Sequence, residues 1–301
     1  MIRPVRFGFN EQTAESNAFQ DVTIAAQTKD VAQEDALQAF DEMVRQLKAA
    51  GVEVMVVDDT PAPHTPDSIF PNNWISFHNN GTVILYPMQA ENRRLERRLD
   101  ILDLLEEDYY INRKVDLTYF EQEGKFLEGT GSMVLDRKFK IAYACLSPRT
   151  HPDVLKEFSI QMNYDVVSFQ AVDDAGKAVY HTNVLMCIGD LFAVVCLQAI
   201  PDLDERYMVR QHLEQSGKRI VEITMEQMKH FAGNMLQVKS KKGINYLVMS
   251  TQAYESLTHK QIDILDDYAV LLHCDLSVIE ANGGGSARCM MAEIHLPKRE
   301  K

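Results

Sequence analysis

Cys289, His181 and Glu128 are the residues whose types and positions could together carry out chemistry. Cys289 follows a glycine-rich stretch, "NGGGSARCM", while His181 begins "HTNVL" and Glu128 begins "EGTGS". A cysteine thiolate can attack a carbon bonded to nitrogen, a histidine can move the proton, and a carboxylate can hold substrate N–H groups. Taken singly, each residue is more often structural than catalytic, so their chemistry depends on whether the fold brings them together.

The other four cysteines look structural. The chain has five cysteines, an odd number, and no CxxC pair, so neither a disulfide framework nor a structural zinc site is indicated. Four lie in apolar stretches typical of small buried side chains; they are Cys145, Cys187, Cys196 and Cys274. Cys289 differs because it follows a polar, glycine-rich loop.

A faint internal repeat indicates how distant residues could meet. Five segments share a Gly- or Asn-rich corner, a short apolar strand, a polar turn and a second apolar strand. The corners recur at intervals of about fifty residues, a period typical of repeats arranged in a ring. In such a ring the corners would converge near the centre, although Gly and Asn are also ordinary turn formers. The corners are Asn73, Gly131, Asn183, Asn234 and Gly284.

Helices and further strands are expected between these hairpins. Amphipathic spacing predicts helices over residues 30–51 and 91–109, and the first of these stops at a glycine. Third strands are expected over residues 52–58, 165–171, 218–223 and 269–275. Each unit then contains a hairpin, a helix and a strand, which predicts an α/β fold.

Composition limits the classes of partner. The chain has 301 residues, 46% of them hydrophobic, and a formal net charge of -13, which argues against nucleic acid or an anionic membrane surface as a partner. No apolar run has the length of a membrane span, and residues 1–16 contain no signal-peptide core. We therefore expect a cytoplasmic protein. The sequence leaves open whether it forms a homo-oligomer.

Five motifs together resemble the guanidino-modifying enzyme superfamily, which includes arginine deiminase, dimethylarginine dimethylaminohydrolase and the amidinotransferases. They are "FPNNW", "EGTGS", "SPRT", "HTNVL" and "GGGSARCM". The resemblance implies a five-bladed α/β propeller, the pentein fold, with pseudo-fivefold symmetry over one catalytic domain, residues 1–301. It also implies that Cys289 is the nucleophile, His181 the general acid/base, Glu128 the carboxylate that orients the substrate, and Arg149 the group that grips the substrate's α-carboxylate.

Two departures from the superfamily pattern concern the substrate. Members that act on a cationic guanidinium commonly have an Arg-Asp pair where this chain has Asn72 and Asn73, and His-x-Asp where it has His181 and Asn183. A guanidinium favours carboxylate neighbours, whereas a neutral ureido oxygen can accept from an amide NH2. Thiolate attack on a ureido carbon also creates an oxyanion, which such donors would stabilise.

We therefore expect a cysteine-dependent hydrolase of citrulline that forms ornithine, ammonia and carbon dioxide through an S-carbamoyl enzyme. The substrate-binding residues would be Asn72, Asn73, Arg149 and Asn183, and neither a metal nor an organic cofactor is needed. Two alternatives stay open: an arginine or guanidine deiminase or amidinotransferase, and a non-catalytic relative that only binds an amino acid. The N-terminal segment "GFNEQTAESNAF" could cover the pocket, with Asn10 as a further contact.

Overall fold

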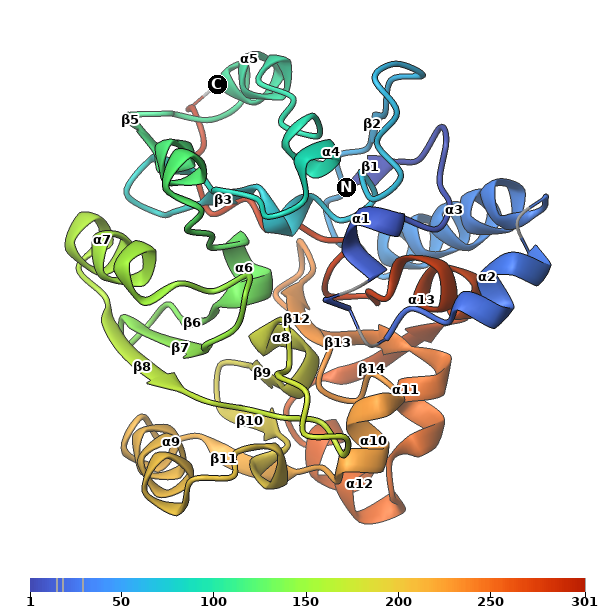
Figure 1. Ribbon diagram of the computed structural model, residues 1–301. Coiled ribbons are helices and arrows are strands. Elements are labelled where there is room, and N and C mark those ends of the chain that lie inside the picture. Colours follow the sequence, from blue (N-terminus) through green and yellow to red (C-terminus); the bar gives the residue numbers. More distant parts are fainter. Residues whose placement is uncertain (15, 18, 29, 301) are drawn as a thin grey trace.

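The strands form five small sheets. The computed structural model describes residues 1–14, 16–17, 19–28 and 30–300. Within these residues there are four three-stranded sheets and one two-stranded sheet. The fold is therefore mixed α/β, as expected. Figure 1 shows the five sheets arranged around a common centre, with each unit occupying one sector.

The four three-stranded sheets share one construction. Two consecutive strands form an antiparallel hairpin, and the second strand also pairs in parallel with a third strand. The sheets are β3 (Ile75–Phe77), β4 (Thr82–Leu85) and β5 (Arg113–Asp116); β6 (Val134–Asp136), β7 (Ile141–Cys145) and β8 (Asp165–Phe169); β9 (Met186–Ile188), β10 (Phe192–Val195) and β11 (Arg219–Glu222); and β12 (Leu236–Lys239), β13 (Asn245–Ser250) and β14 (Val270–Cys274).

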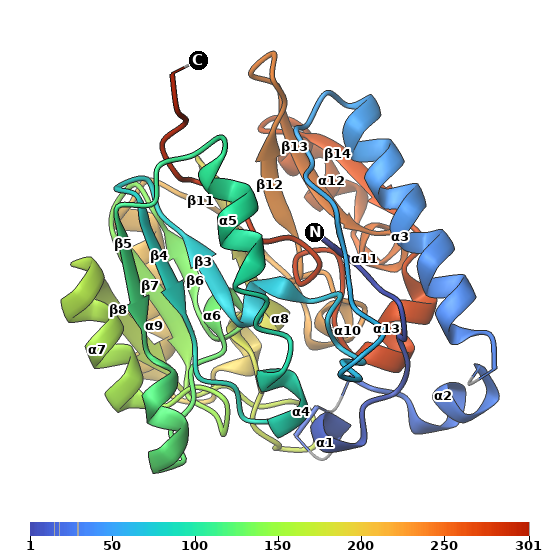
Figure 2. The same cartoon turned by 90° about the horizontal axis from the view of Figure 1, so that it is seen from above.

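Helices make the crossovers that parallel pairing requires. They lie on the outside of the arrangement in Figure 1, and α3 (Ala32–Ala49) and α7 lie at opposite edges in Figure 2. The crossover helices are α4 (Glu91–Arg94) and α5 (Asp100–Glu106), α7 (Pro152–Met162), α9 (Leu203–Gln215), and α11 (Thr251–Ser256) with α12 (His259–Asp266). The remaining short elements are α10 (Met225–Lys229), η2 (Thr118–Glu123) and η3 (Leu197–Ala199).

The fifth unit departs from the expected hairpin. Its sheet contains only β1 (Ile2–Arg3) and β2 (Val57–Asp58), which pair in parallel, so the strand expected over residues 52–58 is shorter. The fifth hairpin was expected over the stretch that contains Cys289, and that prediction is wrong. The amides of Cys289, Met290 and Met291 each bond a carbonyl three residues earlier, so this stretch forms tight turns. The helices here are α1 (Glu11–Ala14), α2 (Val22–Thr28), α3 (Ala32–Ala49) and α13 (Ser277–Gly283).

The expected single helix over residues 91–109 is also wrong, because it is interrupted between α4 and α5. Arg93 and Glu96 are both buried and bond each other at 2.9 Å. Arg94 and Arg97 donate to the backbone carbonyls of Met88 and Tyr86. These inward contacts stabilise an irregular path that a regular amphipathic helix would not allow. The helix expected over residues 30–51 is confirmed as α3.

Each three-stranded sheet begins at a short turn that contains its Gly or Asn corner. Three of these turns are helical, and α6 packs against both η1 and α8 near the centre of Figure 1. The turns are η1 (Pro71–Asn73), α6 (Gly129–Ser132), α8 (Thr182–Leu185) and residues 231–234. Segments about fifty residues apart in sequence therefore contact one another at the centre.

The apolar faces of the sheets and helices form the core. The four cysteines expected to be structural are buried and free, and burial raises the thiol pKa of Cys145, Cys187 and Cys274 to about 12. Those thiols therefore stay protonated at neutral pH. Across the described residues, no helix combines the length and apolarity needed to cross a bilayer.

The close approach of neighbouring corners makes Gly131 a sensitive position. A Cβ atom on Gly131 would lie 2.3 Å from Asn73 Nδ2 and 2.8 Å from His181 Nδ1. We expect Gly131→Ala to lower the free energy of unfolding by about 1–3 kcal/mol, the usual cost of overpacking. Urea denaturation measures this, with Gly8→Ala as the control because a Cβ there meets nothing within 4 Å. Equal stability of the two variants would contradict the close approach.

Candidate active site

Cys289 lies in the turns after α13, and its side chain is buried. Its sulfur is 3.4 Å from Asn183 Nδ2 and 3.3 Å from Asn234 Nδ2. Both asparagines are corners of other sheets, so three units meet at one sulfur atom. His181 and Cys289 line the same small cavity.

Glu128 and His181 form a hydrogen-bonded pair, and His181 lines the cavity that Cys289 also lines. Glu128 precedes α6 and His181 precedes α8, and the distance between Glu128 Oε2 and His181 Nε2 is 2.8 Å. Burial lowers the pKa of His181 to about 4, more than its bond with Glu128 raises it. Burial alone would raise the pKa of Glu128, but Arg149, His181 and Arg93 hold it well below its ordinary value.

These two shifts define the protonation state at neutral pH. The Glu128 carboxylate is ionised and can only accept a hydrogen bond, so His181 Nε2 carries the proton. His181 Nδ1 then has a lone pair and can take a proton. The pair is therefore set up as a neutral base beside a permanent anion.

Two arginines flank Glu128. Arg149 Nη1 is 3.5 Å and Arg93 Nη1 is 3.9 Å from its Oε2 atom. Arg149 also donates to Ser16 Oγ at 2.7 Å and to the carbonyl of Thr13 at 3.0 Å. The structure thus brings Arg149 to the cavity, with much of its donor capacity used by the N-terminal segment.

Asn73 and Asn72 are both buried but differ in their surroundings. Asn73 Oδ1 accepts from Arg93 Nη1 at 3.0 Å, and its Nδ2 donates to the Glu128 carbonyl at 3.4 Å. Among the described residues, neither polar side-chain atom of Asn72 has a hydrogen-bond partner. Asn73 lines the cavity and Asn72 does not, so the structure separates two residues that the sequence treated alike.

The two polar side-chain atoms of Asn183 differ in their hydrogen bonding. Its Nδ2 donates to the Cys289 sulfur, while its Oδ1 is buried without a partner in the described part of the chain. An amide donor that contacts the sulfur also lies beside any carbon that the sulfur attacks. Asn183 can therefore hold both a thiolate and an oxygen attached to the reacting carbon.

Asp67 and Arg93 are site residues that the sequence reasoning missed. Asp67 lines the cavity; its Oδ2 lies 3.7 Å from Arg93 Nε and accepts from Asn10 at 2.7 Å. Its Oδ1 is buried and without a partner among the described residues. Arg93 lies in the first turn of the helix expected over residues 91–109, but nothing in the sequence pattern there shows that its side chain points inward. Asp67, three residues before Phe70 in "DSIFPNN", could have been noticed by its closeness to a corner.

The N-terminal segment forms part of the wall of this cavity. The volume of the cavity is about 10 Å³, about enough for one water molecule. Thr13 and Asn17 line it, and Asn17 Nδ2 donates to the Gly283 carbonyl at 3.3 Å. The expected cover by residues 8–19 therefore holds for the described residues; residues 15 and 18 lie outside them. The cavity as it stands is too small for an amino acid.

The surroundings of Glu128 are unsuited to a metal ion. Its carboxylate faces the guanidinium groups of Arg149 and Arg93. In the described residues there is no cluster of three or more His, Cys, Asp and Glu side chains that could hold a metal.

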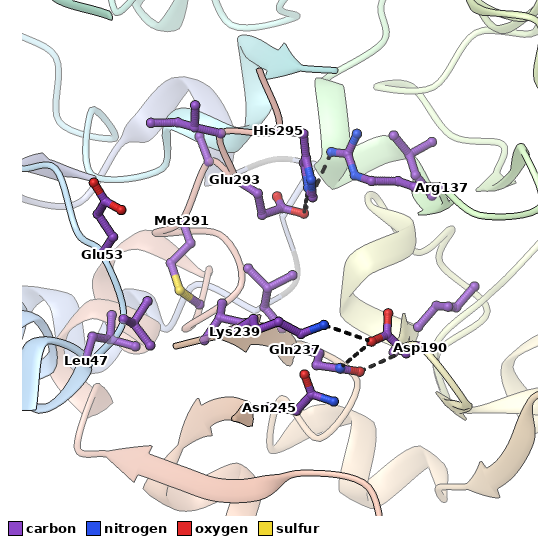
Figure 3. A pocket seen from close by; sticks show the side chains of 18 of the residues that line it. Leu47, Glu53, Arg137, Asp190, Gln237, Lys239, Asn245, Met291, Glu293 and His295 are labelled. Carbon is purple, nitrogen blue, oxygen red and sulfur yellow. Dashed lines mark hydrogen bonds and ion pairs between the residues drawn. The ribbon is translucent and has the colours of Figure 1, made fainter. Parts of the chain in front are cut away.

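A second, wider cavity of about 580 Å³ lies between β6, β9, β12 and the C-terminal segment. Figure 3 shows Arg137, Glu293 and His295 pointing toward one another on one side of it, and Asp190 with Lys239 on another. Neither Cys289 nor His181 lines this cavity. The chemistry-bearing residues therefore belong to the smaller cavity.

Comparison with solved structures shows the same fold. The N-terminal domain of ArgZ bound to product, an arginine dihydrolase from cyanobacteria, matches with a TM-score of 0.74 at 19% identity, over 99% of this chain and 98% of that one. Unliganded AgrE matches with a TM-score of 0.76 at 17% identity, over 100% of this chain but 39% of AgrE. A dimethylarginine dimethylaminohydrolase carrying an S-methyl-L-thiocitrulline adduct matches with a TM-score of 0.64 at 13% identity, over 96% of each chain.

Sequence comparison identifies the family. A search of curated proteins found no match. The family model described as "N,N dimethylarginine dimethylhydrolase, eukaryotic" matches residues 3–296, nearly the whole chain. With the likeness in fold, this match shows that the chain belongs to that family, within the guanidino-modifying pentein superfamily.

Proposed function

We propose that the protein hydrolyses citrulline to ornithine, ammonia and carbon dioxide through a covalent S-carbamoyl intermediate on Cys289. The observation that carries this proposal is the charge around the cavity. The Glu128 carboxylate already faces Arg149 and Arg93, and the groups that contact the Cys289 sulfur are neutral amides. A guanidinium would meet the two buried cations Arg149 and Arg93 where the Glu128 carboxylate is already paired, and the other free carboxylate oxygen, Asp67 Oδ1, is taken by the α-ammonium in this proposal. A neutral ureido group would meet no such repulsion.

The α-ammonium and α-carboxylate of the substrate have complementary partners in this proposal. Asp67 Oδ1, buried without a partner among the described residues, accepts from the ammonium. Arg149 binds the carboxylate after it releases Ser16 and Thr13. In this proposal, movement of the N-terminal segment both opens the cavity and frees the Arg149 guanidinium to bind the substrate carboxylate.

The first half-reaction transfers the carbamoyl group to sulfur. His181 Nδ1 takes the Cys289 proton, and the resulting imidazolium is stabilised by Glu128 at 2.8 Å. The thiolate forms a bond to the ureido carbon, and Asn183 Nδ2 donates to the oxygen that gains charge. The bond from that carbon to the δ-nitrogen breaks, His181 returns its proton to this nitrogen, and ornithine leaves.

The second half-reaction regenerates the thiol. His181 takes a proton from water as the water oxygen bonds the carbamoyl carbon. The carbon–sulfur bond then breaks, and His181 returns the proton to the Cys289 sulfur. The carbamate released then decomposes to ammonia and carbon dioxide. Cleavage of the terminal amino group first would give the same final products, so the net reaction does not depend on the order.

We include a single domain and a five-bladed architecture in the same proposal. Residues 1–301 form one catalytic domain in which the five units are the blades of a pseudo-fivefold α/β propeller. The ring of sheets in Figure 1 and the turns that meet near α6 support it. The partner of the site is a small amino acid.

Arginine is the second candidate substrate. The fold neighbours include a protein described as an arginine dihydrolase and a complex of AgrE with L-arginine. An arginine hydrolase would use the same thiolate and imidazole. It would need Asn183 Oδ1, the acceptor without a partner in the described residues, to hold a guanidinium N–H group.

A substrate panel separates these candidates. We expect purified protein to release ornithine and ammonia from citrulline, with arginine turned over at least about 100-fold more slowly. Cys289→Ala should reduce the rate by more than about 10³-fold because it removes the nucleophile. Turnover of arginine without turnover of citrulline would refute the substrate assignment. Binding of citrulline without any turnover would indicate a non-catalytic relative.

The neutral amide at Asn183 is open to an isosteric test. Asn183→Asp puts a negative charge where the sulfur and the oxyanion gain charge, so kcat/KM for citrulline should fall by about 10²–10³-fold, as for the loss of one oxyanion donor. Asn112→Asp, at an exposed position, makes the same change elsewhere and serves as the control. An active Asn183→Asp variant that acts on citrulline as well as the control does would contradict this role.

The proposed neutral base gives a pH signature in stability. Because the pKa of His181 falls from 6.5 to about 4 on folding, protonation favours the unfolded chain as the pH drops below 6.5. The free energy of unfolding should therefore decrease by about 2 kcal/mol between pH 7 and pH 5 through this group. In His181→Gln this part of the decrease should vanish, while exposed His64→Gln should keep it. Chemical denaturation at both pH values provides the measurement, and identical pH slopes in all three proteins would count against a buried neutral imidazole.

A further inference from the structure

We propose that Asn234 is a positioning residue for the nucleophile, one that stabilises the Cys289 sulfur as a thiolate through its side-chain NH2 group. This role rests on the proposed function insofar as Cys289 is the attacking atom. Thiol reactivity, however, can be measured without any amino-acid substrate.

The side chain of Asn234 uses its donors and its acceptor at one point. Its Nδ2 lies 3.3 Å from Cys289 Sγ and 2.9 Å from the carbonyl oxygen of Asn183. Its Oδ1 accepts from the backbone N–H of Arg288 at 3.1 Å. An amide has two N–H donors and one carbonyl oxygen, so both donors have a partner. Asn234 is completely buried, and water does not compete for these bonds.

Two of these contacts fix which way the amide faces. The Arg288 N–H can only donate, so Oδ1 must face it, and the Asn183 carbonyl can only accept, so Nδ2 must face that oxygen. The sulfur is therefore on the donor side of the amide. A thiolate can only accept a hydrogen bond, whereas the S–H form would have to reach Oδ1 at the longer distance of 3.7 Å.

Other groups that could donate a hydrogen bond to the sulfur are already engaged. His181 Nε2 donates to Glu128, and its Nδ1 carries no proton to donate. The Arg288 guanidinium, although next to Cys289 in sequence, donates to the Met291 carbonyl at 2.9 Å and to Glu293 at 2.8 Å. Among the described residues, the side-chain donors to the sulfur are the amides of Asn183 and Asn234. A buried sulfur anion needs such donors, because burial without hydrogen bonds disfavours charge.

Using neutral donors has a chemical consequence. A cation beside the sulfur would also lower the energy of a thiolate, but it would neutralise the anion by direct pairing. Two amides stabilise the anion while adding no net charge to the cavity. Asn234 also connects the turn before β12 to α8 and to the turn that carries Cys289, so it places the sulfur relative to two other units.

The rival explanation is that Asn234 only links corners. The pH dependence of alkylation separates the two, since a structural link would not selectively change ionisation of one thiol. The full-length protein is treated with iodoacetamide over a range of pH, and labelling of Cys289 is quantified by mass spectrometry. The other four cysteines are buried and serve as internal references.

Asn234→Ala removes all three bonds, and we expect the pH midpoint of Cys289 labelling to rise by about one unit or more, the usual effect of losing a hydrogen bond to a charged group. Asn234→Asp keeps an acceptor for Arg288 but replaces the donor with a negative charge, so its midpoint should rise further. Asn282→Ala is the matched control: Asn282 is buried and bonds Thr28 and the Val278 carbonyl, away from the sulfur. Its midpoint should match wild type.

Unchanged midpoints in folded Asn234 variants would overturn the proposal and leave Asn234 as a structural link. Should Asn234→Ala fail to fold, an unchanged midpoint in Asn234→Asp, which keeps the shape of the side chain, would still overturn the proposal. A raised midpoint in the Asn234 variants, together with a wild-type protein that does not hydrolyse citrulline, would support the role of Asn234 while refuting the proposed function. Normal labelling in variants that still hydrolyse citrulline would refute the role of Asn234 alone.

Discussion

The site depends on a single buried carboxylate, Glu128, that stays ionised in the protein interior. Burial opposes its charge, and Arg149, His181 and Arg93 together overcome that opposition. The same contacts give His181 a proton on Nε2 and leave Nδ1 free. One ion cluster thus sets the protonation state of His181 at neutral pH.

The fold provides this cluster by bringing chain corners to the centre. Asn73, Glu128 and His181 each lie at the start of a sheet, and Cys289 lies in turns that replace the fifth hairpin. The corner at Gly131 tolerates little increase in side-chain size, because a Cβ atom there would lie too close to Asn73 and His181. The close packing at the centre therefore also fixes the geometry of the site.

Sequence spacing predicted the α/β units, α3 and the corners, since apolar periodicity and turn residues act locally. It did not predict the break between α4 and α5, because the inward path of Arg93 depends on Glu96 and Asn73, partners that only folding supplies. The fifth hairpin failed for a similar reason: turn bonds around Cys289 replace a ladder. Asp67 and Asn234 were missed as site residues, since nothing local shows which atoms their side chains face.

The central claim is that the sulfur attacks an uncharged ureido carbon. Rapid acid quenching of the protein during turnover, followed by mass spectrometry of the Cys289 peptide, tests it most directly. With citrulline, Cys289 should carry a carbamoyl-type adduct that is absent in Cys289→Ala. A persistent adduct formed from arginine, with none formed from citrulline under the same conditions, would contradict it.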